Sequence, residues 1–257
     1  MSRLHLTFEC EAITLAGTLD TAPSASGLLI VSGGNEVRSG AFSGQAKLAA
    51  RMAAAGFPVF RFDRRGVGDS GGQNKGFRKS ARDVHCALAA FRVIAPHVER
   101  VVAFGNCDAA SALMLAQGAE CDALVLSNPW TIEGDDSTPP PAAVRARYSE
   151  KLRNPREVAR LLTGGVNLGK LARGLVQAGR RHSGPTTLAG EMAAGLAAFG
   201  GPVRILLAGA DRTAQVFGEI WNANDDRIAR CEGANHAWGE PHASEFLDRH
   251  LLDMLRG

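Results

Sequence analysis

The chain has 257 residues, of which 45% are hydrophobic and 21% are charged, a composition that fits a folded globular protein and excludes the disordered and fibrous classes. A chain of this length can bury a sizeable core as one domain. The formal net charge of +3 is too small to predict a polyanionic partner, so nucleic-acid binding is not indicated.

The cysteines and the N-terminal residues indicate the cellular compartment in which we expect the protein. Five cysteines are scattered without close pairs, which argues against a disulfide framework and against a zinc ribbon. The N-terminal residues do not match a signal peptide, and no run of 18 apolar residues occurs. We therefore expect a cytoplasmic protein with no membrane span and no metal. The cysteines are Cys10, Cys86, Cys107, Cys121 and Cys231.

Short apolar runs predict the strands of a sheet. Residues 3–20 have the alternating pattern of two strands joined by a polar turn. Further runs bounded by Gly or polar residues follow: GLLIVSGG, FPVFRFD, RVVAFGN, ALVLSNP, VRILLAGAD and RIARCEG. Because helical patterns separate these runs, they predict an α/β fold with a mostly parallel, eight-stranded sheet flanked by helices.

Helical spacing alternates with the strands until about residue 130. The clearest helical patterns are at 41–55, 80–94 (with Ser80 as a candidate N-cap) and 243–255. Residues 131–200 differ, because three consecutive prolines are followed by Arg-rich amphipathic patterns without a strand signal. We interpret this segment as a helical cap inserted into a single domain at 1–257, whose core is formed by 1–130 and 201–257.

The segment VVAFGNCDAAS has the form of a nucleophile elbow. Gly105, Cys107 and Ala109 match the pattern G-x-nucleophile-x-G, in which small residues let the strand and the following helix approach closely. A helix N-terminus favours the thiolate, whereas the carboxylate of Asp108 opposes it. The alternative is that Cys107 is a buried small hydrophobic residue, the usual environment of a free cysteine.

Two strand ends downstream supply the other members of a triad. Asp211 ends one strand and His236 follows the next, in the order nucleophile, acid, histidine. We expect His236 to act as general base and acid, and Asp211 to orient it and stabilise its charged form. His242 is the nearest alternative to His236, and Asp225 or Asp226 could take the place of Asp211.

The expected oxyanion donors are the backbone N–H of Asp108 and those of Gly34 and Asn35. The segment LLIVSGGNE places paired glycines after a strand, as such a loop requires, although Ser32 stands where His is common. Residues 63–72 resemble the D-x-R-G-x-G-x-S loop that packs behind the oxyanion loop in hydrolases. A phosphate cradle is the poorer interpretation of their glycines, because no Gly-Lys-Ser/Thr follows.

Together with LSNPW, the Arg-rich insertion and LAGADRTAQVF, these motifs make nearly the whole chain resemble the first of the two hydrolases associated with exosortase A systems in bacteria. The resemblance implies an α/β-hydrolase fold with Cys107, Asp211 and His236 as catalytic residues. The family's elbow is usually G-x-C-D-G-A, so Ala109 is a departure, as is Asn235-His236-Ala237 in place of Asp-His-Thr. Its genes lie beside exopolysaccharide and PEP-CTERM sorting genes, and neighbouring acyl-carrier and acyl-ligase genes favour an acyl substrate.

The sequence predicts a hydrolase that cleaves a carboxylic ester or acyl thioester through an acyl-Cys107 intermediate, without a cofactor. Acyl transfer from the same intermediate to an alcohol or amine, and a catalytically silent scaffold that binds a lipid or a partner protein, remain alternatives. The insertion is the expected substrate-binding region, where leucines could roof an acyl pocket and arginines could meet an anionic carrier, although helix core and a solvated face are the simpler explanation of any one of these residues. They are Leu161, Leu162, Leu168, Leu171, Leu175, Arg145, Arg147, Arg173, Arg180 and Arg181.

Overall fold

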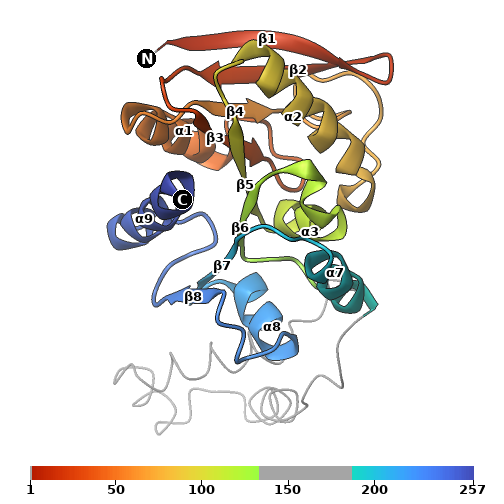
Figure 1. Ribbon diagram of the computed structural model, residues 1–257. Helices are drawn as coiled ribbons and strands as arrows, with labels where there is room; N and C mark the ends of the chain where they lie inside the picture. The colour runs from red at the N-terminus through yellow and green to blue at the C-terminus, as the bar shows by residue number, and fades with distance from the viewer. Residues whose placement is uncertain (1, 133–186) are drawn as a thin grey trace, which may run out of the picture.

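The computed structural model describes residues 2–132 and 187–257. They form one sheet with the strand order β1-β2-β4-β3-β5-β6-β7-β8 (Figure 1). Strands β1, β2 and β4 pair antiparallel, and all other neighbours are parallel. The bounds are Arg3–Cys10 (β1), Ile13–Asp20 (β2), Ser26–Val31 (β3), Val59–Phe62 (β4), Arg100–Asn106 (β5), Ala123–Ser127 (β6), Val203–Ala208 (β7) and Ile228–Cys231 (β8). The predicted eight-stranded, mostly parallel sheet is confirmed.

Helices cover both faces of the sheet (Figure 1). Helices α2, α3, α7 and α8 contribute to one hydrophobic cluster, and α1 and α9 contribute to the other. Because the central strands are covered on both sides, every residue of β6 is buried, which is why these strands read as continuous apolar runs. The helices are Gly44–Ala54 (α1), Ala81–Ile94 (α2), Asp108–Leu115 (α3), Thr187–Ala197 (α7), Arg212–Ile220 (α8) and Pro241–Arg256 (α9), with short 3-10 turns at Ala41–Ser43, Phe77–Lys79 and Gln117–Glu120.

Two helix starts differ from the sequence-based expectation. The helix predicted at 41–55 is divided, because Phe42 (φ 51°) and Ser43 (φ 59°) adopt left-handed backbone angles that a helix cannot continue through. At Ser80 the chain does enter α2, but the hydroxyl donates to the carbonyl of Phe77 at 2.7 Å and does not cap the helix.

Most of the predicted insertion at 131–200, including its leucines and arginines named above, lies outside the described residues. Its last part forms helix α7, which packs against α3. Leu188, Met192 and Leu196 of α7 are buried in the same hydrophobic cluster as the central strands. This stretch therefore belongs to the packed core on one face of the sheet.

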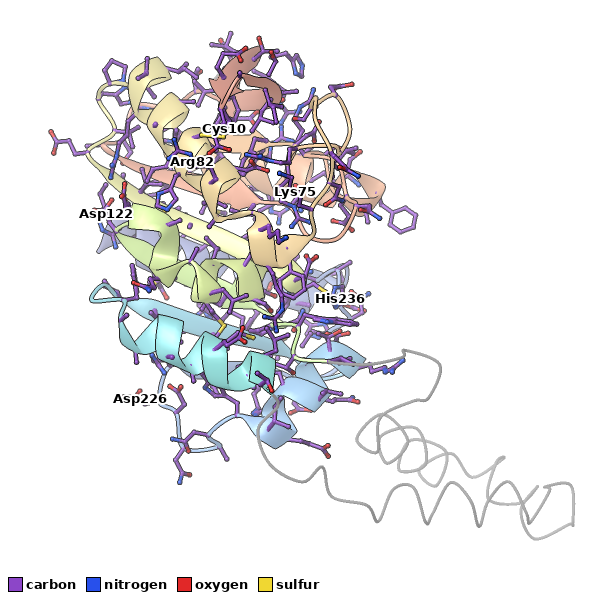
Figure 2. The ribbon with its side chains drawn as sticks, turned by 90° about the vertical axis from the view of Figure 1, so that its right-hand side faces the viewer. Cys10, Lys75, Arg82, Asp122, Asp226 and His236 are labelled. Atoms are coloured by element: carbon purple, nitrogen blue, oxygen red, sulfur yellow. A yellow bond between two sulfur atoms is a disulfide. The ribbon has the colours of Figure 1, made fainter. Side chains whose placement is uncertain are left out.

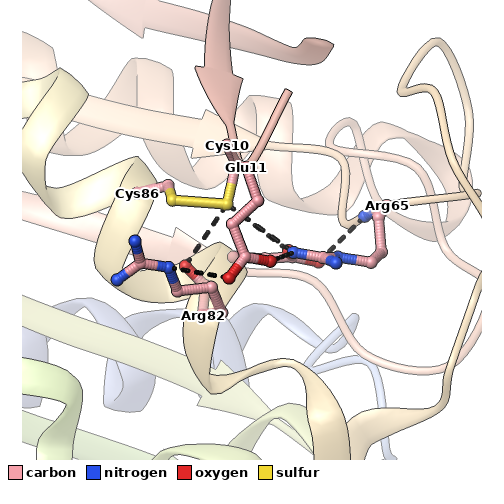
Figure 3. The surroundings of a disulfide bond; sticks show 6 residues. Cys10, Glu11, Arg65, Arg82 and Cys86 are labelled. Atoms are coloured by element: carbon pink, nitrogen blue, oxygen red, sulfur yellow. Dashed lines mark hydrogen bonds and ion pairs between the residues drawn. A yellow bond between two sulfur atoms is a disulfide. The ribbon is translucent and has the colours of Figure 1, made fainter. Parts of the chain in front are cut away.

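Cys10 and Cys86 form a disulfide that ties the end of β1 to α2, where Cys10 also lies beside Arg82 (Figures 2 and 3). The expectation of unpaired cysteines is wrong for this pair. The two are 76 positions apart in sequence, yet their Cα atoms lie 5.6 Å apart because the β1–β2 hairpin packs against α2. Within the described ranges, no helix is both long and apolar enough to cross a membrane.

Candidate active site

Cys107 occupies the turn between β5 and α3 in a strained backbone conformation. Its φ is 61° and its ψ is −127°, a region that non-glycine residues rarely adopt. A Cβ at Gly105 would lie 2.7 Å from the carbonyl carbon of Ala109 and 2.8 Å from the nitrogen of Ala110, so glycine is required there. The thiol is free and half-buried. The turn thus has the shape of a nucleophile elbow and presents the sulfur at the end of the sheet.

The sequence-predicted acid and histidine lie together beside the elbow. His236 Nδ1 is 3.0 Å from Asp211 Oδ2, and Cys107 is close enough to the imidazole to contribute to its pKa. Asp211 is 7% exposed, and its carboxylate also accepts the backbone N–H of Ala214 at the start of α8. Figure 2 shows His236 on the right-hand side of the view, the side on which the turn between β5 and α3 also lies.

The electrostatics of this pair favour a charged imidazole. The hydrogen bond to Asp211, followed by the interaction with Cys107, raises the pKa of His236 to about 10 against the opposing effect of burial. At neutral pH His236 is therefore an imidazolium, placed between a carboxylate and a sulfur atom that can carry negative charge.

The alternatives left open by the sequence lie elsewhere. His242 Nε2 is 3.1 Å from the carbonyl oxygen of Glu232, at the start of α9. Asp225 forms an ion pair with Arg227 at 2.6 Å and accepts the indole N–H of Trp221. The Arg227 guanidinium is the main cause that lowers the pKa of Asp225 to about 2.

A buried amide network, which no motif in the sequence predicted, holds the His236 loop. The side-chain amides of Asn106 and Asn128 donate to the backbone oxygen of His236 at 3.2 and 3.4 Å. Asn128 and Ser127 both donate to Asn106 Oδ1, at 3.0 and 2.8 Å, and the Trp238 indole N–H donates to Ser127 Oγ at 2.8 Å. The signal available in the sequence was only that polar residues follow Phe104 and Leu126 at two strand ends.

The expected oxyanion loop is already engaged. The N–H of Gly34 donates to Asp108 Oδ1 at 2.6 Å. Arg64 donates to the carbonyl of Gly34 through Nη2, which also lies 3.7 Å from Asp108 Oδ2. The Gly34 amide, one of the predicted donors, is therefore occupied by a side chain, while the roles of the N–H groups of Asp108 and Asn35 stay predictions.

Charged side chains support this loop from behind. The buried carboxylate of Asp63 accepts the backbone N–H of Arg38 at 2.5 Å and the N–H of Asp69 at 3.1 Å, and it pairs with the Arg38 guanidinium. Loop 63–72 thus packs against loop 33–38, as expected. The hydroxyl of Ser70 closes loop 63–72 by donating to the Asp63 carbonyl at 2.7 Å.

A second ion-pair cluster lies beneath Arg38. Arg61, which is 2% exposed, donates to the Arg38 carbonyl at 2.7 Å and to Asp20 Oδ2 at 3.2 Å. Arg3 donates to the other oxygen of Asp20 at 2.6 Å. Burial is the main reason that the pKa of Arg61 is lowered. Among residues 2–132 and 187–257, no group of three or more His, Cys, Asp or Glu side chains is placed to hold a metal ion.

Comparison with protein families matches residues 23–173 to the family described as serine aminopeptidase, S33. An esterase from Pyrococcus furiosus is similar in structure, with 14% identity and a TM-score of 0.65 over 99% of this chain and 92% of that one. The α/β hydrolase GrgF from Penicillium sp. sh18 (17%, TM-score 0.63, 100% and 98%) and proline iminopeptidase from Mycobacterium smegmatis (14%, TM-score 0.59, 98% and 98%) are also similar. No curated protein matches the chain. The fold is the α/β-hydrolase fold.

Proposed function

The chain belongs to the serine aminopeptidase S33 family and is an α/β-hydrolase enzyme, and from that premise we propose that it cleaves a carboxylic ester or an acyl thioester with Cys107 as nucleophile. The family is named for a serine, whereas the elbow of this chain carries Cys107. Asp211 and His236 complete the proposed triad.

The backbone of Cys107 carries this proposal. A thiol that serves only as a small buried hydrophobic group needs no strained turn, whereas Cys107 has φ 61°, is half-buried and contributes to the raised pKa of His236. The other free cysteines contrast with it. Cys121 and Cys231 are buried, and burial raises the pKa of both thiols, that of Cys121 to about 12.

The proposed reaction has two halves. The Cys107 sulfur attacks the carbonyl carbon, and the tetrahedral intermediate collapses as His236 gives its proton to the departing alcohol or thiol. Neutral His236 then takes a proton from water, whose oxygen attacks the acyl-cysteine; the bond from carbon to the Cys107 sulfur breaks, the acid leaves, and His236 is again protonated. Asp211 stabilises the charged imidazole in both halves.

Intact-protein mass spectrometry after stopped incubation with p-nitrophenyl esters and acyl thioesters tests the proposal. We expect an acyl adduct on the wild type and on Cys231→Ala, the matched free-cysteine control, and none on Cys107→Ala. Product analysis with added alcohols and amines separates hydrolysis from acyl transfer. Absence of an adduct together with equal background rates in wild type and Cys107→Ala would reject the mechanism and favour the scaffold alternative.

We also propose that the acyl group arrives on a carrier in an exosortase-associated system of the cytoplasm, as the resemblance of the Cys107-Asp108-Ala109 elbow suggests. A kcat/KM higher for carrier-bound than for free acyl thioesters would support the carrier. The Cys10–Cys86 pair tests the location, because a disulfide persists in an oxidising compartment. Trapping of both thiols in the reduced form in cells would agree with the cytoplasm.

A further inference from the structure

Asp108 places a negative charge where the proposed reaction needs an unoccupied donor. It follows Cys107 directly, and its Oδ1 accepts the Gly34 N–H at 2.6 Å. A hydrogen bond from an amide to a carboxylate is stronger than one between neutral groups. A substrate carbonyl oxygen can therefore use the Gly34 amide only after the carboxylate of Asp108 has moved away.

A receiving group for the displaced carboxylate lies alongside. The Arg64 side chain is 5% exposed, and its Nη2 is 3.7 Å from Asp108 Oδ2, which is an ion pair but too long for a direct hydrogen bond. Arg64 Nη1 is buried without a hydrogen-bond partner. A buried guanidinium nitrogen without an acceptor is unfavourable, so an oxygen of Asp108 that moved toward it would satisfy an unmet donor.

We propose that Asp108 is a positioning residue that occupies the Gly34 amide in the free enzyme and moves to Arg64 when the substrate carbonyl enters. This inference rests on the proposed function and adds a substrate-dependent step to it. In the free enzyme Asp108, the residue that follows Cys107, carries a negative charge that opposes the development of negative charge on the sulfur. After the move, Gly34 is available to the developing oxyanion, and the ion pair of Asp108 with Arg64 becomes a direct hydrogen bond.

Two reagents separate this role from a structural one. A short alkyl aldehyde adds to the thiolate of Cys107 and places a hemithioacetal oxygen in the oxyanion site, so its affinity depends on the Gly34 amide. Iodoacetamide is attacked at its methylene carbon with loss of iodide, and no oxyanion forms. Both are measured by mass spectrometry on wild type, with Cys107→Ala as the blank.

We expect Asp108→Ala to bind the aldehyde about tenfold more tightly than wild type, which corresponds to one hydrogen bond of ordinary net strength made available. The rate of alkylation by iodoacetamide should rise by a smaller factor. Asp108→Asn keeps the shape of the side chain and an acceptor for Gly34, so its affinity should lie between the two. Asp253→Asn is the matched control, because Asp253 is an exposed carboxylate of α9, outside these two loops, and it should change neither value.

Arg64→Met tests the receiving group. It should weaken aldehyde binding when Asp108 is present and do so much less in the Asp108→Ala background, because no carboxylate then needs a partner. The bond from Arg64 to the Gly34 carbonyl is lost in both backgrounds and drops out of this double-mutant comparison. Additive effects would overturn the role given to Arg64.

The outcomes for the two proposals differ. If Cys107 reacts with both reagents, and Asp108→Ala binds the aldehyde no better than wild type, the role of Asp108 is wrong and the hydrolase proposal stands. Tighter aldehyde binding by Asp108→Ala with no acyl-enzyme from any ester or thioester supports the role of Asp108 and counts against the proposed reaction. Thermal unfolding of each variant, with Asp108→Asn as the second carboxylate-free form, identifies a loss of fold, since an acidic residue in the first turn stabilises α3.

Discussion

The two sides of Cys107 are held in place by different chemistry. On the side of loops 33–38 and 63–72, ion pairs between arginines and carboxylates support the loops. On the side of His236, the nearest supports are neutral amide and hydroxyl groups, and Asp211 is the one carboxylate that pairs with the imidazole among the described residues. Because the supports near His236 are neutral, Asp211 and Cys107 determine its pKa. The charged side can place positive charge near an oxyanion, but each of its buried charges depends on its partner for stability.

Removal of one partner from the charged side should have the largest effect. Asp20→Ala leaves Arg61 buried without its carboxylate, and we expect a loss of about 3–5 kcal/mol in the free energy of unfolding, measured in urea. Asp248→Ala removes a more exposed ion pair to Arg51 and should lose at most about 1 kcal/mol. Equal losses in the two variants would contradict the importance given to burial.

The disulfide adds a covalent constraint to the same side. Reduction, or Cys86→Ser, should lower the free energy of unfolding by about 4 kcal/mol, because the closed loop of chain between residues 76 positions apart restricts the unfolded state. Urea unfolding with and without a thiol reductant measures this. Cys121→Ser controls for the reductant and should respond to it as the wild type does. An unchanged midpoint on reduction would contradict the expected constraint.

On the side of His236 the expected losses of stability are smaller, but the same changes should also affect catalysis. Asn128→Ala removes the acceptor of the Ala208 N–H and one of two donors to the His236 carbonyl, so we expect a loss of about 1–3 kcal/mol in stability. A lower kcat with a nearly constant KM should accompany this loss of stability, because the His236 loop is then held less firmly in position. Asn222→Ala, in an exposed turn, should alter neither quantity.

Asp211→Asn keeps an acceptor for the Ala214 N–H but removes the carboxylate that pairs with His236, so its effect on stability should depend on pH. The pKa of His236 is raised in the folded protein, so its contribution to stability is complete below its ordinary value of 6.5 and is lost as pH rises through about 10. The descending limb of kcat/KM should follow the same titration, and Asp211→Asn should move it to lower pH. A limb that stays near 10 would show that Asp211 is not the main cause.

The strands and the elbow could be predicted because they depend on local rules. Burial on both faces of the sheet gives β5 and β6 their continuous apolar runs, and Gly105 is required by a close approach within its own turn. Asp211 and His236 could be found because they follow strands in a fixed order. Each of these signals lies within a few residues of the feature that it marks.

The remaining features depend on residues that only the folded chain brings together. Asn106 and the His236 carbonyl are 130 positions apart, and Gly34 and Asp108 are 74 apart. No periodicity or motif records such pairs. For this reason the sequence predicted Gly34 as a donor but not its occupation by Asp108, and the scattered cysteines argued against a disulfide framework although Cys10 and Cys86 pair where β1 meets α2.

The disulfide between β1 and α2 also divides the chain topologically. It closes a covalent ring that runs from Cys10 to Cys86 and includes both loops of the charged side, whereas Cys107, Asp211 and His236 lie outside the ring. A protease cut at one peptide bond inside the ring, for instance at Phe42, which is 93% exposed, would leave the two fragments joined through sulfur. The nicked protein would migrate as one chain until it is reduced, and its two fragments would then report where the ring had been opened.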